Sequence, residues 1–274
     1  MKKTLLLPMM FLAACSISNN ASMNIDGAGI IGGNDVKAAD PVVTSTVGLV
    51  LEQPDGSLRP FCTGVLVSAD MVITAAHCID IMENRTYYVV FGNEIPASKD
   101  DPHVIEVAEA ILHRKFRSVP TKTPGVATSE NDLGAIRLYD KIPGTFKPAV
   151  IVSDKYLMKK DTEVVLVGYG ATSDTKREMP TTLKSVHVKV ARTHDQFLVF
   201  DQSNGKGACF GDSGGPAFLE TAKGLVLVGT TRGPEAGVND CHHYAEYTYL
   251  AKQKEFLINA SDSLDAEPPQ FAKE

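Results

Sequence analysis

Three short segments of this chain carry residue types that together support nucleophilic catalysis. Residues 211–216 (GDSGGP) place one serine, Ser213, on a glycine-flanked turn directly after a carboxylate. Glycines allow backbone conformations that other residues avoid, so amide N–H groups there can converge and hold the oxyanion that forms when a serine attacks a carbonyl. A serine hydroxyl is a poor nucleophile at neutral pH and needs a neighbouring base. A histidine and a carboxylate occur upstream, in residues 74–78 (TAAHC) and 131–136 (NDLGAI).

Each segment alone has an ordinary structural explanation. A histidine followed by a cysteine is often structural, an aspartate before an apolar strand is usually a turn or cap residue, and a glycine turn can hold an incidental serine. Their joint occurrence in the order His, Asp, Ser favours an enzyme. Taken together, the three segments resemble the trypsin/chymotrypsin family of serine proteases, from about Ile30 to about Asn259.

The resemblance implies a role for each matched residue. Ser213 is expected to attack the scissile carbonyl, and His77 to take the serine proton and return it to the leaving amine. Asp132 is expected to hold the imidazole in the useful tautomer and to stabilise its charged form. The backbone N–H groups of Gly211 and Ser213 are expected to form the oxyanion hole.

Short apolar runs separated by turn residues predict an all-β fold from Val42 onward. Most runs are four to eight residues long and rich in β-branched or aromatic side chains, as in a sandwich or barrel. The family resemblance makes this more specific. It implies two six-stranded antiparallel β-barrels, at about 30–142 and 143–248, with the active site between them and a C-terminal helix at about 249–259.

Two polar stretches fall outside this pattern. Residues 117–130 are expected to form a long polar loop, to which the sequence assigns no role. Residues 260–274 are acidic and poor in apolar side chains, and they are expected to be a disordered tail. The net charge of −6 argues against nucleic acid as a partner. No segment after the first fifteen residues has the run of about 18 apolar residues that a membrane span requires.

The N-terminus has the pattern of an export signal. Two lysines precede an apolar run that is too short to span a bilayer, so residues 1–14 are expected to be a signal peptide. Residues 12–15 (LAAC) resemble a bacterial lipobox, which predicts lipidation of Cys15 and, with Ser16 after it, an outer-membrane or periplasmic location. The alternative is a plain secretory signal with an incidental Cys15. Residues 15–29 have the composition of a linker or pro-segment.

The chain has five cysteines, an odd number for an exported protein. The family resemblance pairs Cys62 with Cys78 and Cys209 with Cys241, which leaves Cys15 for a lipid and places the protein in an oxidising compartment. His242 and His243 follow Cys241, but no second ligand cluster accompanies them, so no metal site is predicted. Nothing in the sequence requires a cofactor.

Residues 30–33 (IIGG) resemble the mature N-terminus of this family. Cleavage before Ile30 is then expected to free an ammonium group that pairs with Asp212, because a buried carboxylate needs such a partner. This predicts a zymogen whose activating protease accepts Gly29. The alternative is that Ile30 begins an ordinary strand and Asp212 bonds elsewhere.

The matched segments also place a substrate pocket. Its floor is expected at Gly207 and its walls at Gly233 and Ala245, so no carboxylate is present and an apolar or small P1 side chain is favoured over Arg or Lys. A shift of one residue would instead bring Glu246 into the wall. Arg232 stands where the family commonly has a tryptophan, which could alter the preference at the next subsite.

The sequence therefore predicts an exported serine endopeptidase that acts on protein or peptide substrates and contacts a membrane only through a lipid at Cys15. Two alternatives stay open. One is a binding protein on the same fold, because fold alone does not guarantee chemistry. The other is an esterase-type hydrolase that uses the same triad.

Overall fold

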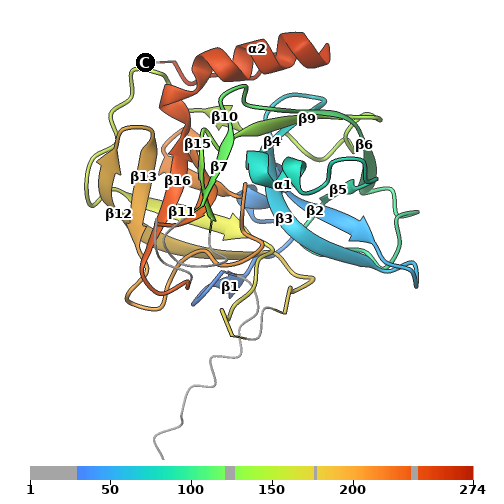
Figure 1. Cartoon of the computed structure of the whole chain (residues 1–274), viewed down its shortest axis with the longest axis horizontal. Coiled ribbons are helices and arrows are strands. Elements are labelled where there is room, and N and C mark those ends of the chain that lie inside the picture. The colour runs from blue at the N-terminus through green and yellow to red at the C-terminus, as the bar shows by residue number, and fades with distance from the viewer. Residues whose placement is uncertain (1–29, 121–126, 176–177, 236–239, 274) are drawn as a thin grey trace, which may run out of the picture.

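Short antiparallel strands close into two barrels that lie side by side (Figure 1). The computed structural model describes residues 30–120, 127–175, 178–235 and 240–273. The expected signal peptide, Cys15 and the linker up to Gly29 lie outside the described residues. Within the described ranges, no helix is long and apolar enough to cross a membrane.

The first barrel closes through six strands. In order around the barrel these are β2 (Thr46–Glu52), β3 (Leu58–Leu66), β4 (Met71–Thr74), β9 (Gly134–Leu138), β6 (Val104–Leu112) and β5 (Tyr88–Phe91). β-branched apolar side chains such as Val47, Val89 and Ile136 are fully buried in its interior. Such side chains pack well on a pleated surface, so they favour strands over helices here.

The second barrel also has six strands. In order these are β12 (Lys184–His194), β11 (Glu163–Gly168), β14 (Pro216–Thr221), β15 (Gly224–Pro234), β16 (Tyr244–Tyr249) and β13 (Phe197–Asp201), which pairs back with β12. The short strands β1 (Asn34–Asp35) and β10 (Val150–Ile151) join β12 and β15 at the outside. The prediction of two six-stranded antiparallel barrels is confirmed.

Residues 117–130 were expected to form a polar loop, but the two ends of this segment are strands that pair with each other as the β7–β8 hairpin. Strands β7 (Arg117–Pro120) and β8 (Ala127–Glu130) pair antiparallel, and Arg117 forms an ion pair with Glu130 across them. The prediction was wrong because these strands lack the alternation of apolar and polar residues that reveals a half-buried strand. Backbone pairing and the ion pair hold them together.

The C-terminal helix lies about five residues further along the chain than the expected 249–259. After a 3-10 turn (Leu250–Lys252), α2 runs over Lys254–Leu264 and ends at Asp265, whose φ of 50° is left-handed. It packs on β6 and β9 of the first barrel, although the chain enters it from the second (Figure 1).

The prediction of a disordered tail from residue 260 onward is also wrong for residues 260–273. Ala260 and Leu264 are each 1% exposed, so α2 continues beyond 259 to bury them. Residues 265–273 then return to β10, where Ile151 N donates to Gln270 O at 2.8 Å and Ala272 N donates to Ile151 O at 2.7 Å. A low apolar content did not prevent order, because a few anchoring side chains and backbone hydrogen bonds hold the segment.

Replacing Leu264 by alanine is expected to destabilise the fold by about 2–4 kcal/mol, because it leaves a cavity under the end of α2. Chemical denaturation measures this loss. Ile258→Ala is the matched control, because Ile258 lies on the same helix but is 39% exposed. Equal effects of the two substitutions would contradict the observed packing.

Candidate active site

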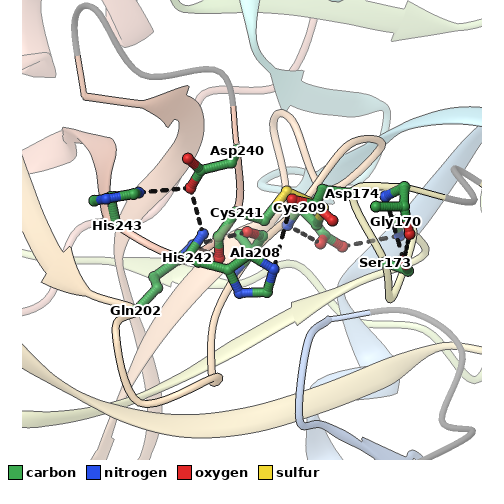
Figure 2. The surroundings of a disulfide bond; sticks show 12 residues. Gly170, Ser173, Asp174, Gln202, Ala208, Cys209, Asp240, Cys241, His242 and His243 are labelled. Carbon is green, nitrogen blue, oxygen red and sulfur yellow. Dashed lines mark hydrogen bonds and ion pairs between the residues drawn. A yellow bond between two sulfur atoms is a disulfide. The ribbon is translucent and has the colours of Figure 1, made fainter.

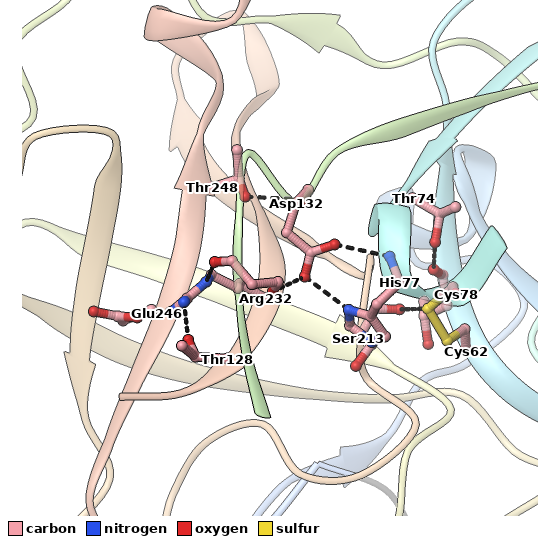
Figure 3. A network of polar contacts seen from close by, with 12 residues as sticks. Cys62, Thr74, His77, Cys78, Thr128, Asp132, Ser213, Arg232, Glu246 and Thr248 are labelled. Carbon is pink, nitrogen blue, oxygen red and sulfur yellow. Dashed lines mark hydrogen bonds and ion pairs between the residues drawn. A yellow bond between two sulfur atoms is a disulfide. The ribbon is translucent and has the colours of Figure 1, made fainter. Parts of the chain in front are cut away.

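His77 and Asp132 form a close pair on the first barrel. His77 lies on the short helix α1 (Ala76–Asp80), directly after β4, and Asp132 lies between β8 and β9. Its Oδ1 accepts the backbone N–H of His77 at 2.9 Å, and its Oδ2 lies 2.7 Å from His77 Nδ1 (Figure 3). The two contacts fix both the position and the ring orientation of the histidine.

The carboxylate of Asp132 is buried, with a fully inaccessible side chain, whereas 32% of the His77 side chain is exposed. Burial by itself would raise the pKa of Asp132. The charge of His77 and hydrogen bonds from His77 and Ser129 outweigh this and hold the pKa below its usual value. The carboxylate is therefore held ionised, as a partner for an imidazolium requires.

Ser129 is a partner of Asp132 that the sequence analysis missed. Its hydroxyl donates to Asp132 Oδ2 at 2.6 Å from the end of β8, in the segment expected to be a loop of no assigned role. On the other side, Thr248 Oγ1 donates to the backbone carbonyl of Asp132 at 3.2 Å. No sequence motif marks Ser129, because its role depends on the β7–β8 hairpin lying against the site.

Ser213 lies on a turn of the second barrel that only glycine can complete. Gly214 has a φ of +79°, and a Cβ there would come within 2.0 Å of Thr74 Oγ1. The backbone carbonyl of Ser213 accepts from Thr63 N at 2.9 Å, which joins this turn to β3 of the first barrel. Ser213 and His77 line the same cleft, of about 470 Å³, between the barrels.

The peptide between Phe210 and Gly211 has a defined orientation. The Phe210 carbonyl accepts from Ala171 N at 2.6 Å. In a planar trans peptide the N–H points opposite to the C=O, so the Gly211 N–H faces away from Ala171. In the part of the chain that the structure describes, neither Gly211 N nor Ser213 N donates to a protein acceptor.

Asp212 is fully buried behind this turn. Its Oδ1 accepts from Gly170 N and its Oδ2 from Cys209 N, each at 2.8 Å. A Cβ on Gly170 would lie 2.4 Å from Asp212 Cγ, so a larger residue would displace the carboxylate. Burial raises the pKa of Asp212 to about 7, against the lowering effect of these two hydrogen bonds.

The expected activation residue Ile30 is buried with 0% exposure, and Ile31 O accepts from Gly207 N at 3.0 Å. Among the described residues, no cationic side chain forms an ion pair with Asp212. A carboxylate in this position is destabilised unless it is protonated or gains a cation.

Of the three expected pocket residues, Gly233 and Ala245 line the cleft, whereas Gly207 does not. Gln202, which the sequence analysis did not single out, lines it instead. The alternative that places Glu246 in the wall does not hold, because this side chain is buried against Arg232.

Arg232 occupies a pairing irregularity between β15 and β16, where an aromatic residue is common in the family that this chain resembles. Its guanidinium forms an ion pair with Glu246, bonds Thr128 Oγ1 and donates from Nε to Ser129 O at 2.7 Å (Figure 3). It also stacks over the Phe197 ring at 4.8 Å. A buried pair of this kind ties β8 to the second barrel and leaves no free charge for the cleft.

The two expected disulfides are present: Cys62–Cys78 beside His77 and Cys209–Cys241 beside the cleft. Within the described ranges, one group of three side chains has a spacing that suits a metal: His77 with Cys62 and Cys78. Its two sulfurs are bonded to each other, so they cannot act as thiolate ligands.

Comparison with known proteins places the chain in a family. The sequence profile of the Trypsin family matches residues 30–257. Brachyurin of Leptuca pugilator is 27% identical over 201 residues, which are 69% of this chain and 84% of that protein. Trypsin theta of Drosophila melanogaster is 26% identical over 263 residues, 90% of this chain and 92% of that protein.

A third relative is much longer than this chain. Mannan-binding lectin serine protease 1 of Mus musculus is 29% identical over 239 residues, 73% of this chain but 31% of that protein. This chain therefore spans about a third of the length of that relative. These three relatives are eukaryotic and give no support to a bacterial origin.

The fold and the cleft define a two-barrel protein of the serine protease class. The chain belongs to the trypsin family. This membership supports a serine endopeptidase that acts on protein or peptide substrates, and the two disulfides fit export to an oxidising compartment.

Ser129→Ala is expected to lower kcat about tenfold with little change in KM, because Asp132 loses a hydrogen bond that holds its charge and position. Steady-state hydrolysis of a peptide substrate measures both constants. Ser263→Ala, an exposed serine on α2, is the control. An unchanged kcat would show that the hydrogen bond from Ser129 does not contribute.

Proposed function

We propose that this chain is a serine endopeptidase with Ser213 as nucleophile, His77 as general base and acid, and Asp132 as the partner of the imidazolium. One observation carries the proposal. The buried, ionised Asp132 holds His77 by two contacts at the edge of the cleft that Ser213 also lines.

The chemistry proposed is acyl transfer in two steps. His77 takes the proton as Ser213 Oγ attacks the substrate carbonyl, and the negative charge develops on the carbonyl oxygen. The N–H groups of Gly211 and Ser213, which have no acceptor among the described residues, are suited to bind that oxygen. His77 then protonates the leaving amine, and water, activated by the same histidine, releases the acyl group from Ser213.

The proposal includes activation by cleavage before Ile30. The new ammonium group would pair with Asp212, whose burial raises its pKa. Among the described residues, this carboxylate has two amide donors but no cationic side chain. Gly29 before the cut requires an activating protease that accepts glycine. Support comes from the full burial of Ile30 on the side of the second barrel where Ile31 pairs with Gly207.

We also propose that the chain prefers an apolar or small P1 side chain over Arg or Lys. The support is a pocket whose walls, Gly233 and Ala245, are small and uncharged. Four further proposals rest on the sequence pattern alone. They are export by residues 1–14, lipidation of Cys15, a bacterial periplasmic or outer-membrane location, and release of the catalytic domain from the lipid when the chain is cut before Ile30.

The uncut chain is expected to lose stability as pH rises from about 4 to about 7. The pKa of Asp212 is raised from 3.8 to about 7 in the folded state, so the folded state holds a proton that the unfolded state has released across this window. The stabilisation that this bound proton gives to the folded state is therefore complete below a pH of about 4 and lost above a pH of about 7. Urea denaturation at a series of pH values measures it.

In the same series, Asp212→Asn should flatten the pH dependence, whereas Asp55→Asn, at an exposed turn, should not. Cleavage before Ile30 should restore stability near pH 7, since the ammonium stabilises the ionised carboxylate. A cut chain with the same pH dependence as the uncut chain would contradict the pairing.

A fluorophosphonate probe tests the nucleophile and the activation together. A full chain with an enteropeptidase site in place of residues 25–29 gives an Ile30 terminus on demand. Labelling and peptide hydrolysis are expected only after the cut, and Ser213→Ala should remove both, with a loss of at least about 10⁴-fold in kcat. Folded, cut protein that takes no label would favour a binding protein on the same fold. Label with ester but no peptide hydrolysis would favour the esterase alternative.

A further inference from the structure

Gln202 follows the last residue of β13 and lies inside the cleft. It is 2% exposed and lines the same cavity as Ser213 and Ala245. An amide so deeply buried requires hydrogen-bond partners, because an unpaired polar group in this position is costly.

All polar groups of the Gln202 side chain have partners around the base of the cleft. Its Nε2 donates to Ala208 O and to Cys241 O, each at 3.0 Å, and its Oε1 accepts from Ala208 N at 2.6 Å (Figure 2). Ala208 and Cys241 are held together by the neighbouring Cys209–Cys241 disulfide. The amide is therefore fixed in one position and fully bonded.

The same amide excludes a side chain at position 207. A Cβ built on Gly207 would lie 2.1 Å from Gln202 Oε1 and 2.2 Å from its Cδ, and Gly207 has a φ of +154°. Its N–H is used by Ile31 O at 3.0 Å, so the backbone cannot easily move away. Gln202 thus fills the space in which a side chain from residue 207 would begin.

We propose that Gln202, rather than residue 207, forms the floor of the P1 pocket and restricts it to uncharged P1 side chains. The inference rests on the proposed peptidase function, which it makes more specific. A cationic P1 group would meet an amide whose two N–H groups already point to carbonyls, and none of the described residues that bond this amide is a carboxylate. An anionic P1 group would find no free donor on this amide.

Asp240 and Arg232 line the same cleft, but both already have partners and do not alter this conclusion. Asp240 Oδ1 accepts from His242 N at 2.8 Å and lies 2.7 Å from His243 Nδ1, so this carboxylate already has partners. The charge of Arg232 is balanced by Glu246. Among the described residues that line the cleft, Gln202 alone bonds both Ala208 and Cys241 with its side chain.

Gln202→Glu tests the floor with almost no change in shape. One carboxylate oxygen can still accept from Ala208 N, while the other faces the carbonyls of Ala208 and Cys241 and needs a cation nearby. We expect this variant to bind 4-aminobenzamidine at least about tenfold more tightly than wild type, because an amidinium and a carboxylate pair strongly when desolvated. The ratio of kcat/KM for Arg over Leu at P1 should rise about a hundredfold.

Gln53→Glu, which makes the same charge change at a residue that does not line the cleft, is the matched control and should leave amidine binding and the Arg to Leu ratio unchanged. Gly207→Asp alone should gain no amidine binding, because its side chain overlaps Gln202, whereas Gln202→Gly with Gly207→Asp should gain it. The Gly207→Asp variant and the double variant keep the test valid if Gln202→Glu does not fold. Thermal unfolding shows whether each variant is folded.

Amidine binding is measured by fluorescence on the full chain, before and after the cut, and requires no catalysis. If neither Gln202→Glu nor the double variant binds the amidine better than wild type, the floor is not at Gln202. A gain by Gly207→Asp alone would overturn the proposal equally. Selective amidine binding by Gln202→Glu without any fluorophosphonate labelling would support the floor and overturn the peptidase function.

Discussion

The site depends on one buried carboxylate at the junction of the two barrels. Asp132 accepts hydrogen bonds from His77 on the first barrel and from Ser129 on the β7–β8 hairpin, and its carbonyl accepts from Thr248 on the second barrel. An ionised group with so little water access is stable only when each oxygen is bonded. The side chain and backbone of this one residue therefore hold three separate elements in position relative to one another.

Close backbone approach is the second constraint. The turn that holds Ser213 passes so near to β3, β4 and Gly170 that several positions admit no Cβ, as Gly170 and Gly214 show. This explains why a short run of glycines was the strongest signal in the sequence. The run encodes a contact between distant segments and is more than a local turn.

The sequence predicted what local chemistry and family motifs determine. The barrels, the His77, Asp132 and Ser213 segments and both disulfide pairs could be found, since each lies in a recognisable motif or apolar run. Ser129, Gln202 and the Arg232–Glu246 pair could not, because no motif marks them and their contacts depend on how the chain folds. Ser129 reaches Asp132 from the end of β8, and Gln202 reaches Cys241 across the base of the cleft. The ordered C-terminal segment was missed for a similar reason, since its hydrogen bonds are to β10.

The path of the C-terminus has a consequence for how this chain can be joined to other domains. Helix α2 leaves the second barrel, packs on the first, and is followed by a strap that returns to β10 (Figure 1). Residues 265–273 thus connect the two halves that carry His77 and Ser213. A fusion partner attached directly after α2 would remove the contacts of residues 265–273 with β10, whereas one attached after residue 273 would leave the alignment of the two halves intact.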